Sequence, residues 1–244
     1  MSQFVLVHGS WHDGSAWQPV VDYLESKGHK AFAPTVAGHG KNVSKAVNHA
    51  QSVQSIVDFI VKKDLRDVVL VGHSYGGTII SKAVEQLPER VKRLVFWNAF
   101  VLADGECLND NVPPHYRTLF AQLIQQSPDR AVMLPFPVFR EAFMNDADLE
   151  AAQQAYAQLS SEPDQFDERL DMKKFYEIIR SGRVACSYLN GLEDTALPPG
   201  EWGWHPRMSS RLGLYRLVQM SASHEAIYSN PDLLARKILE AGRD

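Results

Sequence analysis

The stretch VLVGHSYGGTII, residues 69–80, constrains the fold more than any other part of the chain. Its first residues form an apolar, β-branched run typical of a buried strand, and a helical pattern begins at Gly76. Between them lies GHSYG, residues 72–76, which matches the pattern G-x-S-x-G. Glycines at both flanks allow a strand to turn sharply into a helix, because larger side chains would collide there. The motif therefore predicts that Ser74 is a nucleophile, held at the carboxyl edge of a sheet beside a helix N-terminus.

Further apolar runs have the strand-like character of the segment before Ser74. Together with DVVLVGH (67–73), they are FVLVHG (4–9), KAFAPTV (30–36), RLVFWNAF (93–100), RVACSYLNG (183–191) and LYRLVQM (214–220). Helical patterns fall between them, over residues 15–27, 48–63, 76–87 and 231–239. Continuous apolar runs suit strands that are buried on both faces. The alternation predicts an α/β fold, with a mostly parallel six-stranded sheet flanked by helices.

Residues 104–182 break this alternation. They contain no convincing strand, and helical patterns cover residues 116–126, 138–144, 147–159 and 173–180, separated by prolines. The segment is too long for a single crossover between two strands. We therefore expect a core formed by residues 1–103 and 183–244, with residues 104–182 inserted above the sheet as a helical cap, or lid.

A serine hydroxyl is a weak nucleophile unless a base accepts its proton. Among nine histidines, His224 is the one that follows the last predicted strand, where such a base is expected. A carboxylate must orient that histidine. Asp194 follows the strand 183–191 and is the first choice, with Asp104 second and Glu193 third. The resulting catalytic set is Ser74, Asp194 and His224.

Acyl transfer also needs two backbone N–H groups that bind the oxyanion. Tyr75, directly after the serine, and Ser10, in the loop after the first strand, are the expected donors. Gly9 lets that loop pass close to the serine. His12 either points into the cleft or is a structural residue, and the sequence does not decide between the two.

The substrate pocket is expected between the sheet edge and the cap. The aromatic and apolar side chains that could line it are Phe120, Leu123, Phe136, Phe139, Phe143, Trp202 and Trp204. Together with Gly9 and His12, Phe120, Phe136, Phe139 and Trp202 form the predicted substrate-binding set. An apolar pocket of this kind favours a small apolar or aromatic ester.

The composition narrows the function further. The chain has 244 residues, 25 basic against 29 acidic, and a net charge of −4, which gives no basic footprint for nucleic acid or an anionic membrane. Cys107 and Cys186 have no metal-type spacing, and they suit free thiols in a reducing compartment. With no leader-like N-terminus, we expect a cytoplasmic protein. We expect no cofactor, metal, nucleic-acid or membrane partner, and a homodimer is possible.

These residues resemble the α/β-hydrolases, in particular the branch of plant methylesterases and hydroxynitrile lyases with their bacterial esterase relatives. The resemblance lies in VHGSWHDGSAW, GHKAFAPTVAGHG, VGHSYGGTII, FMNDADLEAAQQ, YLNGLEDTALPPG and ASHEAIYSNPDLLARKI, which together run over most of the chain. The last two segments look like the acid and base segments of that family. The resemblance implies the acid and base roles for Asp194 and His224, and a core without the first two strands of larger hydrolases.

Two positions depart from the lyases of this family. The lyases carry threonine and lysine where this chain has Gly9 and Glu225. Gly9 leaves room for an ester carbonyl, and Glu225 offers no cation for a departing cyanide. Plant esterases commonly have methionine at the second position, so their substrates are not implied. We expect a serine-dependent carboxylic-ester hydrolase; a lyase, a cofactor-independent oxygenase and a non-enzymatic ligand receptor on the same fold are the alternatives.

Overall fold

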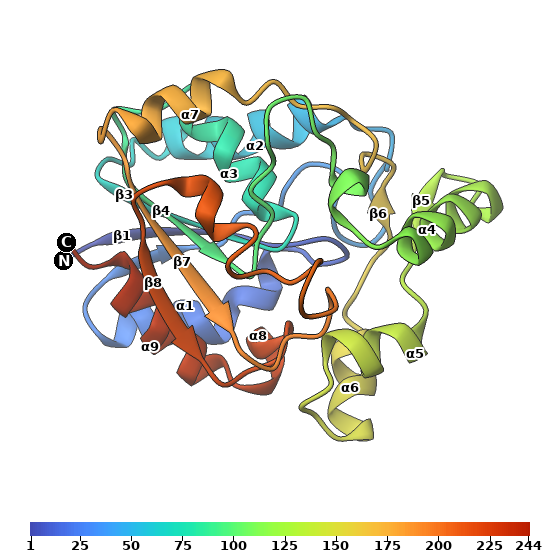
Figure 1. Cartoon of the computed structure of the whole chain (residues 1–244). Coiled ribbons are helices and arrows are strands. Elements are labelled where there is room, and N and C mark those ends of the chain that lie inside the picture. The colour runs from blue at the N-terminus through green and yellow to red at the C-terminus, as the bar shows by residue number, and fades with distance from the viewer.

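A single parallel sheet of six strands forms the centre of the molecule, which we describe from a computed structural model of residues 1–244 (Figure 1). The strand order is β2-β1-β3-β4-β7-β8, and every pairing in this sheet is parallel. The strands are β1 (Gln3–Val7), β2 (Lys30–Phe32), β3 (Val68–His73), β4 (Val91–Trp97), β7 (Ala185–Gly191) and β8 (Arg216–Met220). The predicted fold class and the number of strands in the sheet are confirmed.

Two of these strands end three or four residues before the ends of the apolar runs that predicted them. Strand β2 ends at Phe32, and Pro34 in the expected continuation has no N–H with which to extend a ladder. Strand β4 ends at Trp97, because Asn98 adopts a left-handed backbone conformation with a φ of 33°. Apolar composition continues beyond each point, so it could not mark the strand ends.

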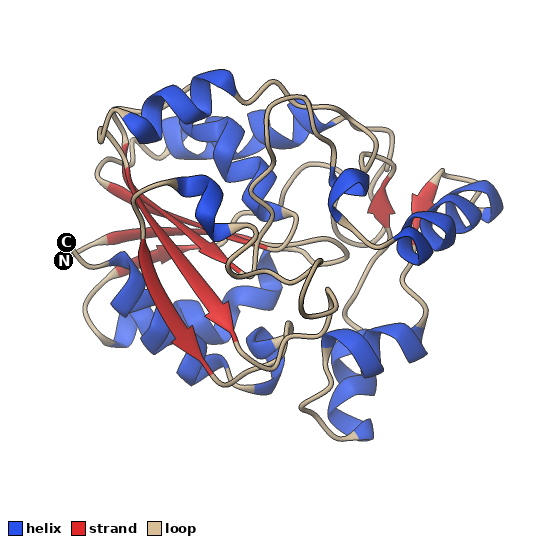
Figure 2. Cartoon of the chain, viewed as in Figure 1, coloured by secondary structure: helices blue, strands red, loops and turns tan.

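Helices cover both faces of the sheet (Figures 1 and 2). One face packs against α1 (Gln18–Ser26), α8 (Ala226–Ser229) and α9 (Pro231–Gly242), and the other against α2 (His49–Lys62), α3 (Gly76–Val84) and α7 (Lys173–Arg180). The apolar side of each helix is buried against the strands, which is the main source of folding free energy in such a layered structure. None of the helices is long and apolar enough to cross a membrane.

The cap lies beyond the carboxyl ends of the strands (Figure 1). It contains α4 (Pro114–Gln126), α5 (Phe136–Val138), a π-helical turn over Phe139–Phe143, α6 (Leu149–Tyr156) and a 3-10 turn over Leu108–Asn111. It also contains an antiparallel pair of strands, β5 (Ala131–Val132) and β6 (Glu162–Pro163), in a segment that we expected to lack strands. Two-residue strands leave no periodic pattern, so the sequence could not reveal them.

Helix α7 lies apart from the rest of the expected cap segment. Its Phe175 is fully buried and packs edge-to-face against Phe96 of β4, with ring centroids 6.4 Å apart. The helix therefore belongs to the layer that covers the sheet, beside α3. The expected cap segment 104–182 thus includes one helix of the core, which its helical pattern alone could not distinguish.

Close backbone contacts hold the turn from β3 to α3. Ser74 has a φ of 52°, in the left-handed region that residues other than glycine rarely adopt. A Cβ atom on Gly76 would lie 2.6 Å from the carbonyl oxygen of His8, and one on Gly77 would lie 2.4 Å from that of Phe100. A Cβ on Gly72 would lie 2.7 Å from the oxygen of Gly76. The steric reason that was predicted for the flanking glycines is confirmed.

Gly77→Ala should destabilise the fold, because the new methyl group would be forced against the backbone of residue 100. We expect the free energy of unfolding, measured by urea denaturation, to fall by about 2–4 kcal/mol. Gly203→Ala is the matched control, since its Cβ would have no neighbour closer than 3.4 Å. A change below about 0.5 kcal/mol is expected there. Equal losses in both variants would contradict the steric account.

Candidate active site

The side chains of His224 and Asp194 form a direct buried contact. Nδ1 of His224 lies 2.6 Å from Oδ2 of Asp194, and both side chains are at most 2% exposed. Since the carboxylate can only accept, Nδ1 carries the proton and donates it. The second carboxylate oxygen accepts from the backbone N–H of Ala196 at 2.8 Å. This arrangement fixes the ring orientation of His224 and leaves its Nε2 free to act as a base.

Asn98 holds the carboxylate from the other side. Its side-chain amide donates to Oδ2 of Asp194, and its carbonyl oxygen accepts from the N–H of Gly191 at 2.9 Å. Asn98 is fully buried at the end of β4. Sequence reasoning missed this residue, although an asparagine inside an otherwise apolar strand-like run, 93–100, was a signal available for it.

The alternative acids lie elsewhere. Asp104 accepts from the N–H of Met172 at 2.9 Å and lies 3.8 Å from Nζ of Lys173, over the surface of α7. Glu193 is exposed and accepts from the hydroxyl of Ser221. Neither touches His224, so the structure favours the first choice, Asp194.

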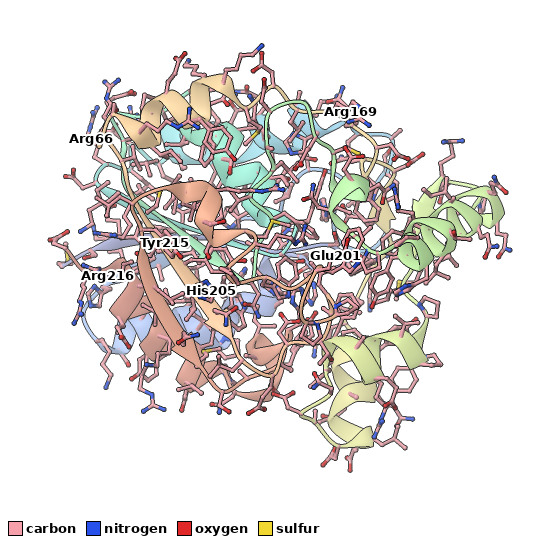
Figure 3. All side chains as sticks on the ribbon, in the orientation of Figure 1. Arg66, Arg169, Glu201, His205, Tyr215 and Arg216 are labelled. Atoms are coloured by element: carbon pink, nitrogen blue, oxygen red, sulfur yellow. The ribbon has the colours of Figure 1, made fainter.

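Ser74 and His224 line one cavity between the sheet edge and the cap, with an empty volume of about 370 Å³. In Figure 3, Glu201 and His205 mark the loop after β7, near the carboxyl ends of the strands. Arg66 and Arg216 mark the amino ends of the strands. The remaining lining residues are Ser10, Trp11, Phe100, Leu108, Val112, Tyr116, Phe120, Phe143, Phe166, Ala196, Leu197 and Trp204. Aromatic rings therefore dominate a wall that has few polar groups.

Only part of the predicted substrate-binding set lies at the cavity. Phe120 lines the cavity, whereas Phe136 and Phe139 do not, because both rings pack against Tyr156 inside the cap. Trp202 is also outside, with its ring under the guanidinium of Arg207. Trp11 and Phe166 are lining residues that were missed. The direction of a side chain on a short helical turn depends on tertiary packing, which composition does not reveal.

His12 also lies outside the cavity. Its ring is 3% exposed, Nδ1 lies 2.6 Å from the carbonyl oxygen of Ser10, and Nε2 lies 3.0 Å from Oε2 of Glu225. The ring also stacks on Tyr228, with centroids 5.6 Å apart. The structural reading of His12, which the sequence left open, is the one that the structure supports.

Gly9 brings the loop after β1 against the serine. A Cβ at this position would lie 2.8 Å from Cβ of Ser74, so a larger residue would push the two apart. The backbone N–H groups of Ser10 and Tyr75 donate no hydrogen bond within the protein. Buried amides without partners are rare, which makes this pair suitable to bind a developing oxyanion.

Aromatic side chains surround the ring of His224. Trp204 stacks on it with centroids 5.3 Å apart, and Phe143 meets it edge-on at 5.3 Å. The ring of His73 lies 4.5 Å away on another side. Burial, reinforced by the nearby His224, holds the pKa of His73 well below its ordinary value. A neutral His73 adds no charge that would oppose protonation of His224.

The fold and this geometry define a class of protein. Residues 4–237 match the family described as "Alpha/beta hydrolase family", so the chain belongs to the α/β-hydrolase family. The sheet, the elbow at Ser74 and the serine and histidine at the carboxyl ends of the strands are the features of that class.

Several relatives are similar to this chain. An extracellular α/β-hydrolase from a Paenibacillus species, described as sharing structural and functional homology with tobacco salicylic acid-binding protein 2, superposes with a TM-score of 0.95 at 40% identity, with 100% of both chains covered. A carbendazim-hydrolysing esterase of Nocardioides sp. (strain SG-4G) is 34% identical over 46% of this chain and 48% of its own. Salicylic acid-binding protein 2 of Nicotiana tabacum is 26% identical over 97% and 95%. The match thus spans about half the length of the Nocardioides esterase.

Replacing the orienting carboxylate should disable His224, because an amide can present the wrong partner to Nδ1. For Asp194→Asn we expect the rate at which a fluorophosphonate probe labels Ser74 to fall by about 10³–10⁴-fold. Asp104→Asn and Glu193→Gln serve as controls and should label at the wild-type rate. Full labelling of Asp194→Asn together with loss in Asp104→Asn would overturn the assignment.

Proposed function

We propose that this protein is a serine-dependent carboxylic-ester hydrolase that works through an acyl-enzyme. The observation that carries the proposal is the shared cavity of Ser74 and His224, with the ring of His224 fixed by Asp194 at 2.6 Å. The relatives described as an esterase and a methylesterase support the same reaction. The serine elbow by itself would show only the fold.

The chemistry follows from the positions of these groups. Nε2 of His224 accepts the hydroxyl proton as Oγ of Ser74 attacks the ester carbonyl, and Asp194 stabilises the resulting imidazolium. The amides of Ser10 and Tyr75 bind the oxyanion, and the N-terminus of α3 adds a favourable field. His224 then protonates the leaving alkoxide, and water, deprotonated by the same ring, releases the acid.

The substrate that we propose is a small apolar or aromatic ester. The cavity of about 370 Å³ is lined mainly by aromatic and aliphatic side chains, such as Trp11, Phe120 and Trp204. An ester of this kind leaves no charged or strongly polar group unpaired against the apolar wall.

The lyase alternative finds no support in this site. Glu225 occupies the position that carries lysine in the lyases, and its side chain turns toward His12 rather than into the cavity. No cation is therefore supplied to a departing cyanide. Neither the oxygenase nor the receptor alternative is favoured by a specific observation.

The compartment and the assembly remain predictions. Both cysteines, Cys107 and Cys186, are free and buried, which is compatible with the proposed cytoplasmic location. The similar Paenibacillus hydrolase is described as extracellular. A homodimer is likewise a prediction, which gel filtration with light scattering tests.

Ser74→Ala should abolish hydrolysis of p-nitrophenyl acetate and butyrate, together with fluorophosphonate labelling. The expected loss of kcat is about 10⁴-fold or more, because nucleophilic attack is removed while the binding groups remain. Turnover that survives the substitution unchanged would exclude this mechanism. Labelling without ester turnover in the wild type would instead favour a receptor that retains the reactive serine.

Phe120→Ala should widen the cavity and shift the preference toward longer acyl chains. We expect the kcat/KM ratio of p-nitrophenyl octanoate to acetate to rise by about tenfold, which corresponds to a few additional methylene contacts. Phe136→Ala is the matched control, because it removes a ring that packs on Tyr156 outside the cavity. A similar rise in the control would mean that the cavity is not the acyl site.

A further inference from the structure

The peptide unit between Ser10 and Trp11 is held at both ends by buried groups. The carbonyl oxygen of Ser10 lies 2.6 Å from Nδ1 of His12, and the N–H of Trp11 donates to Oε2 of Glu162 at 3.1 Å. Loop peptides usually exchange such partners with water. Here Ser10 and Trp11 are 4% and 5% exposed, so water cannot replace either contact. The orientation of this peptide plane is therefore set by two side chains.

Each contact belongs to a buried imidazole–carboxylate pair. Nε2 of His12 lies 3.0 Å from Oε2 of Glu225, an ion-pair contact without hydrogen-bond alignment, and neither atom has a hydrogen-bond partner. Nε2 of His39 lies 2.9 Å from the same Oε2 of Glu162 that accepts from Trp11. The carboxylate of the first pair, Glu225, directly follows His224 in the chain, and that of the second, Glu162, lies on strand β6 of the cap.

The partners of each ring identify its protonation state. In His12, Nδ1 faces a carbonyl oxygen and Nε2 faces a carboxylate, and neither oxygen can donate. In His39, Nδ1 faces the carbonyl oxygen of Ala37 at 3.1 Å, and Nε2 again faces a carboxylate. An ionised glutamate beside each ring therefore requires that both nitrogens of His12 and of His39 carry a proton.

His8 provides the contrast within the same loop. Its Nδ1 donates to the carbonyl oxygen of Gly9 at 2.9 Å, and its Nε2 accepts from the N–H of Val36 at 3.0 Å, so the ring is neutral. Burial holds the pKa of His8 well below its ordinary value. Burial also opposes the charged form of His12, but the adjacent Glu225 raises that pKa overall.

The loop needs such support because its backbone is strained. Trp11 has a φ of 67°, in the left-handed region that a bulky residue rarely adopts. Conformations of this kind persist where the surroundings over-determine them, and they concentrate at functional sites. Cap residues also hold the rest of Trp11: its indole N–H donates to Val132 at 2.9 Å, and its carbonyl accepts from Ser160 at 2.8 Å.

We propose that the His12–Glu225 and His39–Glu162 pairs together clamp the Ser10–Trp11 peptide. The clamp fixes the backbone on the carboxyl side of Ser10, and through it the orientation of the Ser10 N–H, which belongs to the preceding peptide and points toward the oxyanion. Glu225 and Glu162 are then positioning residues for ester hydrolysis, because they act through the loop and touch no reacting atom. The inference rests on the proposed function. It adds that the orientation of the Ser10 N–H depends on two parts of the chain: the segment that carries His224 and Glu225, and the cap.

The test replaces each carboxylate by its neutral isostere. In Glu225→Gln and Glu162→Gln, we expect kcat for p-nitrophenyl butyrate to fall about 10- to 100-fold, a part of the loss seen when an oxyanion donor is removed. KM should change by less than about threefold, because an oxyanion contact acts in the transition state. The inhibition constant of phenylboronic acid, whose serine adduct carries an oxyanion-like oxygen, should rise by the same factor as kcat falls.

Glu85→Gln is the matched control. Glu85 is 9% exposed and pairs with Lys82 at 2.5 Å at the end of α3, away from the loop. It should leave kcat and the phenylboronic acid constant unchanged. The clamp is refuted if the wild type is active and both loop variants keep wild-type values. A wild-type protein that neither turns over esters nor reacts at Ser74 would instead refute the proposed function.

A measurement on the wild type keeps the proposal testable if the glutamine variants do not fold. Proton–nitrogen correlation spectra of the imidazole rings should show His12 and His39 with both nitrogens protonated at neutral pH. His8 should show a proton on Nδ1 alone. A neutral ring at His12 or His39 would overturn the proposal, because the clamp requires two charged pairs.

Discussion

The near-contact of backbones at the elbow is the constraint on which the rest of this structure depends. Strand β3 passes into α3 through Ser74, and the turn brings Gly76 against the carbonyl of His8 and Gly77 against that of Phe100. These approaches fix the distances between β1, β3 and β4, so the loops after those strands meet at one place. The serine, the Ser10 amide and Asn98 are neighbours for this reason, although they come from separate parts of the chain.

The buried carboxylate of Asp194 is hydrogen-bonded from several directions. Asp194 accepts from His224, Asn98 and the Ala196 amide, and each of these donors comes from the end of a different strand or the loop after it. A buried carboxylate is costly unless such donors surround it, and removing one partner leaves the others uncompensated. The site is therefore rigid because of its hydrogen bonds, while the apolar cavity wall supplies the space for a ligand.

The sequence allowed the prediction of those parts that local rules govern. The elbow, the six-stranded sheet and the positions of Asp194 and His224 follow from strand patterns and from the residues directly after them. The cavity wall did not follow, since Phe120 points inward and Phe136 points to Tyr156 for reasons of packing. His12 was undecided because the outcome depended on Glu225, more than 200 residues away in the chain. Asn98 was overlooked because its partner also comes from another strand.

The contacts of Trp11 have a consequence for the evolution and engineering of this fold. Its amide, carbonyl and indole N–H bind Glu162, Ser160 and Val132, which all belong to the cap. The cap and the loop after β1 thus form one structural unit, although about 120 to 150 residues of the chain separate the bonded partners. Recombination that exchanges the cap between relatives has to carry this loop with it. Otherwise the exchanged cap would lack Trp11, the residue through which it binds this loop of the core.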